Sequence, residues 1–374
     1  MKNFTSGKYT QQFEYQSFSP SLINRNFTWE DKEIDVYLES AVKALTELKA
    51  ITNFTPNVDG FIKLHVVKEA TYSNRIEGTR TSIDEALLPE LNIDIERRED
   101  WKEVQNYINA MNYAVCMIEK VPFSIRLINE THKVLLEGVR GKYKLPGEIR
   151  KSQNWIGGYD IKSARYVPPH FSEISDLLSD WEKFWHNKDV QVPILIKIAI
   201  MHYQFESIHP YLDGNGRIGR LIIILQLIDS KFLDKPILYL SNFIEKNRSE
   251  YYELLRKVKN ENTLYLWVKF ILIAFRDSAL ESITVLNKLQ GLTQEYMKLA
   301  ETLGRRTQLA IKLIEYMFGN PIISVNIAKV VLDVTFPTAN AVINDLTKLN
   351  VLRLVNQKER DRLYSLHEYI EAFQ

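Results

Sequence analysis

The stretch "PILIKIAIMHYQFESIHPYLDGNGRIGRLIIILQLIDSKFL", residues 193–233, decides the fold. Two isoleucine-rich runs flank a loop, 209–216, that contains Asp-Gly and Asn-Gly, and both of these dipeptides are hairpin signals. Since isoleucine favours strands, a hairpin of two long strands is the local alternative. Each run has about 15 residues, whereas strands usually have about 3–10. Length therefore predicts two buried helices joined by the loop.

Helical spacing recurs on both sides of this stretch. Apolar residues three and four apart predict a helix over 31–53, and a second helix over 60–77 stops before Gly78, a residue favoured just past a helix end. Further helices are expected at 100–120, 123–138, 171–187, 249–258 and 263–284. Residues 1–30 lack periodicity and are interpreted as an arm lying on the body. The pair Gly157-Gly158, inside 150–166, predicts a small hairpin.

The C-terminal part has a different texture. Residues 285–305 are charged and weakly apolar, which indicates a linking helix. From about residue 307, three predicted helices and two short strands around a charged tip follow in the order of a winged helix-turn-helix. The chain is therefore divided into a helical region at 1–100, which contains the helix at about 60–78, a core at 101–285, and a linker helix with a winged-helix domain at 286–374.

Composition and charge exclude several classes of protein. The net charge of +1 over 374 residues gives no global attraction to nucleic acid or membrane. A single cysteine, Cys116, rules out an internal disulfide framework and a cysteine-built zinc site. No run approaches the ~18 apolar residues of a membrane span, and the N-terminus lacks the apolar run of a signal peptide. We expect a cytoplasmic protein that does not enter the membrane.

The loop and the helix after it read "HPYLDGNGRIGR", residues 209–220. Its inner G-x-G-x-x-G has the spacing of a dinucleotide-binding fingerprint, but that motif requires an apolar strand running into the first glycine. Here Pro210 follows a helix and argues against a central strand. The chain also lacks a Walker A motif and the protein-kinase signatures. A dinucleotide fold is therefore excluded.

The same residues suit a phosphate site of another kind. Gly214, Asn215 and Gly216 open a helix, where backbone N–H groups and the positive end of the helix dipole attract an anion. Arg217 and Arg220 lie three apart on one face of that helix, so their guanidinium groups can bind neighbouring phosphates.

Two further residues add chemistry. Asp213 supplies the hard oxygen ligand that Mg²⁺ requires in a phosphate site, and His209 can accept a proton from a hydroxyl near neutral pH. Taken singly, each feature has a bland alternative: a turn, a solvent-facing arginine or a packed histidine. Their joint occurrence within twelve residues favours phosphoryl or nucleotidyl transfer.

The stretch closely resembles the signature of the Fic family, H-P-F-x-D/E-G-N-G-R-x-x-R. Tyr211 replaces the usual phenylalanine and keeps an aromatic ring. The resemblance covers roughly residues 60–285. It implies an all-helical (all-α) Fic core with a small hairpin flap at 150–166, and an enzyme that transfers AMP from ATP to a Ser, Thr or Tyr hydroxyl of a protein, releasing pyrophosphate. The target can be another protein or the enzyme itself.

The resemblance also implies roles for single residues. His209 would be the general base, and Asp213 would bind the Mg²⁺ that bridges the α- and β-phosphates. The implied ATP-binding set is Gly214, Asn215, Gly216, Arg217, Ile218, Gly219 and Arg220, with Arg217 and Arg220 on the β- and γ-phosphates. In "EYYELL", residues 250–255, Tyr252 would line the adenine pocket, although core packing explains a helical tyrosine equally well.

A second motif lies upstream. Ser73 and Glu77, followed by Gly78, match the Fic inhibitory pattern S/T-x-x-x-E-G/N, on a helix N-terminal to the signature. A carboxylate in the last turn of a helix opposes the helix dipole. The bland alternative is a solvent-facing glutamate. The resemblance implies instead that Glu77 pairs with Arg220 and occupies the place of the γ-phosphate.

Other functions stay open at this stage. The same site could remove AMP from a target, with Glu77 positioning water. A transcriptional regulator acting through the winged-helix domain is a third reading, supported by a modest basic excess over 348–362. The residues concerned are Lys348, Arg353, Lys358, Arg360 and Arg362, against Glu359 and Asp361. DNA is thus a candidate partner beside a target protein, and a homodimer is one arrangement that the sequence leaves open.

Overall fold

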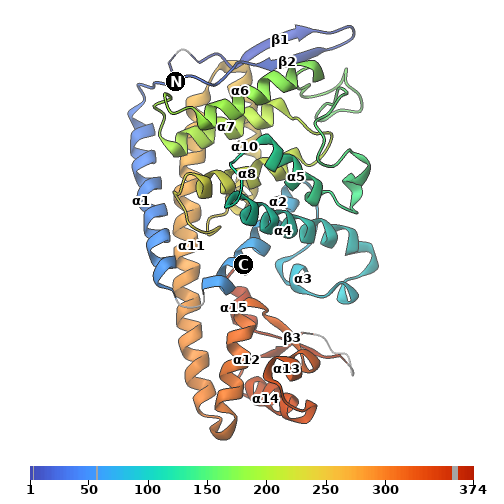
Figure 1. Ribbon diagram of the computed structural model, residues 1–374, viewed down its shortest axis with the longest axis vertical. Coiled ribbons are helices and arrows are strands. Elements are labelled where there is room, and N and C mark those ends of the chain that lie inside the picture. Colours follow the sequence, from blue (N-terminus) through green and yellow to red (C-terminus); the bar gives the residue numbers. More distant parts are fainter. Residues whose placement is uncertain (3, 56–57, 356–360) are drawn as a thin grey trace.

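The structure is a computed structural model that describes residues 1–2, 4–55, 58–355 and 361–374. Its architecture is mostly helical, which confirms the predicted fold class, and it also contains two small antiparallel sheets (Figure 1). A helical body lies between the β1–β2 hairpin at one end and a smaller C-terminal part at the other (Figure 1). Among the helices of the described ranges, none is long and apolar enough to cross a membrane.

The central helices form as the length argument predicts. The two isoleucine-rich runs become α7 (Ile194–Ile208) and α8 (Asn215–Asp229), and almost every residue of both is buried. Tertiary burial on all sides therefore accommodates isoleucine in helices despite its strand preference. The two helices pack against each other, so the loop between them is held at the centre of the body.

Most other predicted helices are present with shifted ends. α1 (Lys32–Phe54) begins after Asp31, whose side chain accepts a hydrogen bond from the Glu33 backbone N–H, which is the usual N-cap interaction. α2 (Val58–Ile76) ends one residue before Glu77. The remaining helices of the body are α3 (Ile83–Leu87), α4 (Arg98–Ile118), α5 (Ile125–Leu135), α6 (Ile174–His186), α9 (Ser241–Lys246) and α10 (Arg248–Glu261), with 3-10 turns at Glu90–Asn92, Ile95–Arg97, Arg140–Tyr143 and Phe171–Glu173.

The N-terminal arm is more regular than expected. β1 (Gly7–Gln11) and β2 (Gln16–Pro20) form an antiparallel hairpin, which the sequence analysis missed because short polar strands carry little periodicity. The hairpin does lie on the body: the Phe18 N–H donates to the Val167 carbonyl over 2.9 Å, and the Gln204 side chain donates to the Ser21 carbonyl over 3.0 Å.

The prediction of a separate linking helix over 285–305 is wrong, although most of this segment is helical. α11 (Leu264–Glu301) is one continuous helix of 38 residues that lies beside α1 (Figure 1). Buried Ile283, Leu286 and Leu289 continue its apolar face through the predicted break. An uninterrupted apolar stripe keeps the helix packed, so the rise in charge did not mark a boundary.

The C-terminal part of the described chain is built from helices and short strands. They are α12 (Thr307–Gly319), β3 (Ile322–Ser324), α13 (Val325–Leu332), α14 (Phe336–Lys348), β4 (Arg353–Leu354), β5 (Leu363–Ser365) and α15 (His367–Glu371), after a 3-10 turn at Gly304–Arg306. The sheet order is β3-β5-β4, and β3 is a strand that the sequence analysis did not predict. Of the basic residues singled out here, Lys358 and Arg360, with the neighbouring Glu359, lie outside the described residues.

Candidate active site

The loop between α7 and α8 is shaped by two left-handed residues. His209 ends α7 with φ 50° and ψ 62°, and Gly214 precedes α8 with φ 76°. A Cβ at Gly214 would lie 3.3 Å from Nε2 of His132, so glycine meets both the backbone and the space requirement. The Asn215 side chain closes the loop by accepting from the Tyr211 N–H and donating to its carbonyl, each over 2.8 Å.

His209 is placed to act as a neutral base. Burial lowers the pKa of its imidazole to about 4, and the charge of Arg150 acts in the same direction. Its Nδ1 atom is buried without a hydrogen-bond partner among the described residues. An imidazole that is neutral at pH 7 can accept a proton, which is what a general base requires.

Arg150 is a residue that the motif search missed. Its side chain is 1% exposed, and its guanidinium donates to the carbonyls of His209 (3.0 Å), Ser152 (3.1 Å) and Pro169 (2.6 Å). It therefore connects the base of the predicted flap to the loop between α7 and α8. A lone arginine in a polar segment gives no sequence signal for this role.

His132 supports the loop from the other side. Its Nδ1 accepts from the Gly147 N–H over 2.8 Å, so Nε2 carries the hydrogen and donates to the Asp213 carbonyl over 2.9 Å. Its ring stacks on Tyr211, with centroids 3.9 Å apart. The Tyr211 hydroxyl donates to Asn129 over 2.6 Å, which accounts for tyrosine at the one position that departs from the signature.

Arg217 is already paired. It is 5% exposed and donates to Glu103 on α4 over 3.1 Å, to Asn74 over 3.4 Å and to Asp213 over 3.4 Å. Glu103 also accepts from Arg140 over 2.7 Å. Glu103 is thus a second residue that sequence reasoning missed, because its link to the loop depends on how α4 packs.

Arg220 meets both residues of the upstream motif. Its Nη2 donates to Glu77 Oε1 over 2.8 Å, and its Nε donates to Ser73 Oγ over 2.9 Å. The Arg220 side chain is 1% exposed, whereas that of Glu77 is 35% exposed. The contact predicted between two segments more than 140 residues apart is therefore present in the structure.

Glu77 occupies the anion position of a helix N-terminus. A Cβ at Gly216, in the first turn of α8, would lie 2.4 Å from Glu77 Oε1. The carboxylate follows the end of α2, where the dipole opposes it, but it faces the positive end of α8, which favours it. Burial would raise the pKa of Glu77, yet Arg220, Arg217 and His209 outweigh burial and the pKa lies below its usual value.

Asp213 is the candidate metal ligand. Its carboxylate is 41% exposed and accepts from its neighbour Gly214 over 2.6 Å. The described residues contain no group of three or more His, Cys, Asp or Glu side chains that could hold a metal ion. A single carboxylate fits Mg²⁺ that is bound mainly by substrate phosphates and water, and does not fit a cation held by protein alone.

Two residues of the predicted set face away from the cradle. Ile218 is fully buried in the core, and Gly219 packs against Glu206, whose Oε1 would lie 2.2 Å from a Cβ at that position. Glu206 Oε1 is buried without a partner among the described residues. Burial raises the pKa of Glu206 to about 7, despite the opposing charge of Arg220.

The flap and Tyr252 border the site. Ile156 and Tyr166 form an antiparallel bridge around the tight turn, and the Asn154 side chain donates to the Tyr211 carbonyl over 2.9 Å. Tyr252 on α10 is 44% exposed, which argues against pure core packing. Burial of its hydroxyl and the charges of Glu77 and Glu206 raise its pKa, so it lies close to these two carboxylates.

The site combines a histidine, a carboxylate and two arginines around a glycine-rich helix N-terminus. This combination is typical of a helical protein that binds nucleotides. The family comparison agrees. Residues 37–116 match the Fic/DOC family N-terminal model and residues 122–227 match the Fic/DOC family model. This chain belongs to the Fic/DOC family.

Curated relatives share part of the chain. Protein adenylyltransferase Fic of Drosophila erecta is 26% identical over 184 residues, which are 48% of this chain and 33% of that protein. The protein of the same name from Aedes aegypti is 28% identical over 214 residues, 55% of this chain and 39% of that protein. The chain thus spans little more than a third of the length of these relatives.

Solved structures share the fold more widely. A Fic family protein from Desulfovibrio desulfuricans has a TM-score of 0.59 at 19% identity, covering 91% of this chain and 97% of that one. Fic-1 from C. elegans has a TM-score of 0.53 at 20% identity, covering 68% of this chain and 74% of that one. At such identities the likeness concerns the fold alone.

Proposed function

We propose that this protein is an auto-inhibited adenylyltransferase, which transfers AMP from ATP to a hydroxyl of a protein and releases pyrophosphate. The observation that carries the proposal is the position of Glu77: its carboxylate lies on Gly216 and Arg220, at a helix N-terminus suited to a phosphate. The names of the curated relatives support the same reaction.

Each group of the site would have its own role in the reaction. His209, neutral because burial lowers its pKa, takes the proton of the target hydroxyl as that oxygen attacks the α-phosphorus. The first amides of α8 hold phosphate oxygens, and Arg217 and Arg220 hold the outer phosphates once their carboxylate partners yield. Mg²⁺ on Asp213 would supply charge neutralisation of the phosphates. The flap, anchored through Arg150 and Asn154, would align the target by strand addition.

The proposal also assigns a role to each of the three parts of the chain. Residues 1–100 would contribute the inhibitory helix, residues 101–285 the catalytic core, and residues 286–374 an accessory domain of the winged-helix class. The protein would act in the cytoplasm on a target protein or on itself. Intact mass spectrometry after incubation with ATP and Mg²⁺ tests the proposal: we expect an added AMP on the protein or on lysate proteins, and no adduct on either would refute transfer.

Removal of AMP is the second candidate function. The carboxylate of Glu77 lies beside the loop that holds His209, and it is partly exposed, so it could position water against a modified target. A modified protein that loses its AMP faster with wild type than with a Glu77→Gly variant would favour this reading.

Asp213→Ala should remove most transfer activity and its dependence on Mg²⁺, because the phosphates lose the only carboxylate that the loop offers to the cation. We expect a loss of about 10²-fold or more, in the range seen when transition-state charge loses its partner. AMP incorporation is measured across a Mg²⁺ titration, with Asp176→Ala, an exposed aspartate on α6, as a control. A variant still stimulated like wild type would place the metal elsewhere.

Glu206→Gln should make folding stability less dependent on pH. The folded-state pKa of about 7 lies above the ordinary value of 4.5, so stability from the protonated form is full below pH 4.5 and is lost as pH rises through 7. We expect the variant to gain about 1–3 kcal/mol over wild type at pH 8 and little at pH 4.5. Urea unfolding at both pH values checks this, with the exposed Glu119→Gln as control; equal gains at both would contradict it.

A further inference from the structure

The arginine of the inhibitory pair has a second set of contacts, which do not involve Glu77. Arg220 Nε donates to Ser73 Oγ over 2.9 Å, and Nη2 donates to the Ser73 carbonyl over 2.9 Å. If the Glu77 carboxylate leaves, these two hydrogen bonds remain. The guanidinium would therefore keep its orientation on α2 when its place beside Glu77 is vacated.

Ser73 is itself held by a buried chain of hydrogen bonds. Its hydroxyl acts on that of Tyr107 on α4 and favours a lower Tyr107 pKa, against the larger raising effect of burial, and the Tyr107 hydroxyl donates to Glu69 Oε1 over 3.0 Å. A guanidinium has donors only, so Ser73 Oγ accepts from Arg220 and its own hydrogen is free for Tyr107. Donors thus point one way, from Arg220 to the Glu69 carboxyl. Ser73 and Tyr107 are fully buried, and Glu69 is 1% exposed.

Glu69 is fixed at its far end. It accepts from the backbone N–H of Ser241, over 3.1 Å, and from the Ser241 hydroxyl, at the start of α9. Because the chain is closed at both ends by hydrogen-bonded partners, a change in its middle leaves a buried polar group unsatisfied. Its effect should reach Arg220 through Ser73.

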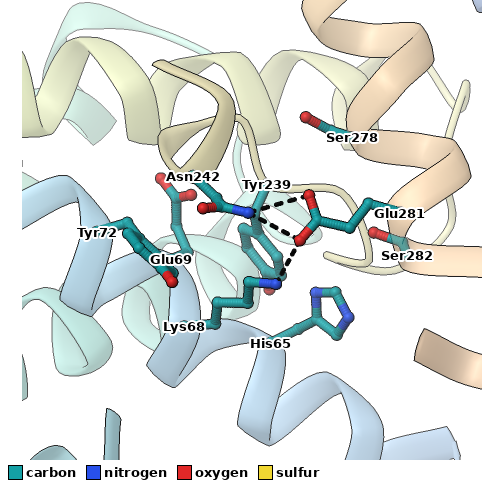
Figure 2. Close-up of a pocket in the computed structure, with 9 residues that line it drawn as sticks. All are labelled: His65, Lys68, Glu69, Tyr72, Tyr239, Asn242, Ser278, Glu281 and Ser282. Carbon is teal, nitrogen blue, oxygen red and sulfur yellow. Dashed lines mark hydrogen bonds and ion pairs between the residues drawn. The ribbon is translucent and has the colours of Figure 1, made fainter. Parts of the chain in front are cut away.

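The helix that contributes Ser73 and Glu69 is firmly attached to the body. Figure 2 shows Lys68 of α2 and Asn242 of α9 converging on Glu281 of α11, in the cavity lined on one side by Glu69. The Lys68 ammonium donates over 2.7 Å and the Asn242 amide over 2.7 and 3.0 Å. These contacts hold α2 in place beside the site. We therefore expect that relief of inhibition moves only the Glu77 side chain, which lies beyond the end of α2.

We infer that Tyr107 and Glu69 are positioning residues for the reaction, which hold Arg220 through Ser73 in the orientation that binds the γ-phosphate. The inference rests on the proposed function. It gives α2 two opposite roles: Glu77 blocks the guanidinium, and Ser73, supported by Tyr107 and Glu69, orients it. Deleting α2 would then abolish transfer, whereas removing the Glu77 carboxylate alone would activate it.

Nucleotide discrimination tests the inference. In a Glu77→Gly background, dissociation constants for ATP and ADP are measured by calorimetry with Mg²⁺, because only ATP offers a γ-phosphate. Adding Tyr107→Phe should weaken ATP binding about tenfold, the effect of one hydrogen bond to a charged group, and leave ADP binding unchanged. Glu69→Gln keeps an acceptor for Tyr107 and should retain part of the preference for ATP.

Tyr296→Phe is the matched control, since that tyrosine is buried on α11 and its hydroxyl has no partner among the described residues. If the ratio of the dissociation constants for ATP and ADP is unchanged in Tyr107→Phe, the inference is overturned. An equal weakening of ATP and ADP binding would also overturn it, because that result indicates a purely structural role. If Tyr107→Phe does not fold, the same ratio of dissociation constants is measured in Glu69→Gln, and an unchanged ratio there would overturn the inference. A Glu77→Gly protein that binds neither nucleotide would instead refute the proposed function.

Discussion

Replacing Glu77 by glycine should raise AMP transfer, self-modification included, by about 10- to 100-fold. Glu77 holds Arg220 through a charged hydrogen bond of 2.8 Å, and such bonds contribute about 1.5–3 kcal/mol. While the bond persists, Arg220 cannot bind the γ-phosphate, and the carboxylate repels that phosphate from the first turn of α8. Glycine removes both obstacles. Since Glu77 lies just past the end of α2 and is partly exposed, the fold should lose little.

Three further proteins make this result interpretable. Arg220→Ala should not activate, because it removes the phosphate-binding group together with the brake. The double variant should behave like Arg220→Ala alone, since both changes act through one arginine. Glu119→Gly, also at the end of a helix, is the control for a glycine placed there.

Incorporation of labelled AMP is compared for all five proteins at matched concentration. Equal rates for wild type and Glu77→Gly would refute auto-inhibition by this residue. Wild type could also yield less modified protein than Glu77→Gly because it removes AMP. If that difference disappears when removal is blocked, the result would point to the AMP-removing activity instead.

His209→Ala should lower AMP transfer by about 10²–10⁴-fold, the usual effect of losing a general base. The measurement is best made in the Glu77→Gly background, where the starting rate is high. ATP affinity should change little, because the phosphate-binding amides and arginines come from α8 and the imidazole acts on the incoming hydroxyl. His367→Ala on α15 is the matched control, because that histidine side chain is 37% exposed and lies outside the α7–α8 loop.

The pH profile provides a second test of the same residue. Burial lowers the pKa of His209 to about 4, so its imidazole is unprotonated throughout the neutral range. The rate should therefore show no inflection from this group between pH 6 and 8, and should fall only as pH approaches 4. Near wild-type transfer by His209→Ala would remove the assignment of the base.

Local sequence was sufficient for the central helices and for the loop. Two runs too long to be strands predicted α7 and α8, and the glycines after Asp213 predicted the start of the second helix, both from local sequence alone. The pairing of Glu77 with Arg220 was reached by resemblance and is present in the structure. The N-terminal strands and the continuity of α11 were not reached, because short strands and helix continuation depend on what packs against them.

The sequence by itself determined which groups surround the helix N-terminus: His209, Asp213, the glycines and the arginines all lie within twelve consecutive positions. Only the tertiary structure decided what those groups touch. Glu103 reaches Arg217, and Arg150 reaches His209, from segments with no motif of their own. Ser73 depends in turn on Tyr107 and Glu69. The physical reason is that buried polar groups must find partners, and packing of distant helices chooses which partners are within hydrogen-bonding distance.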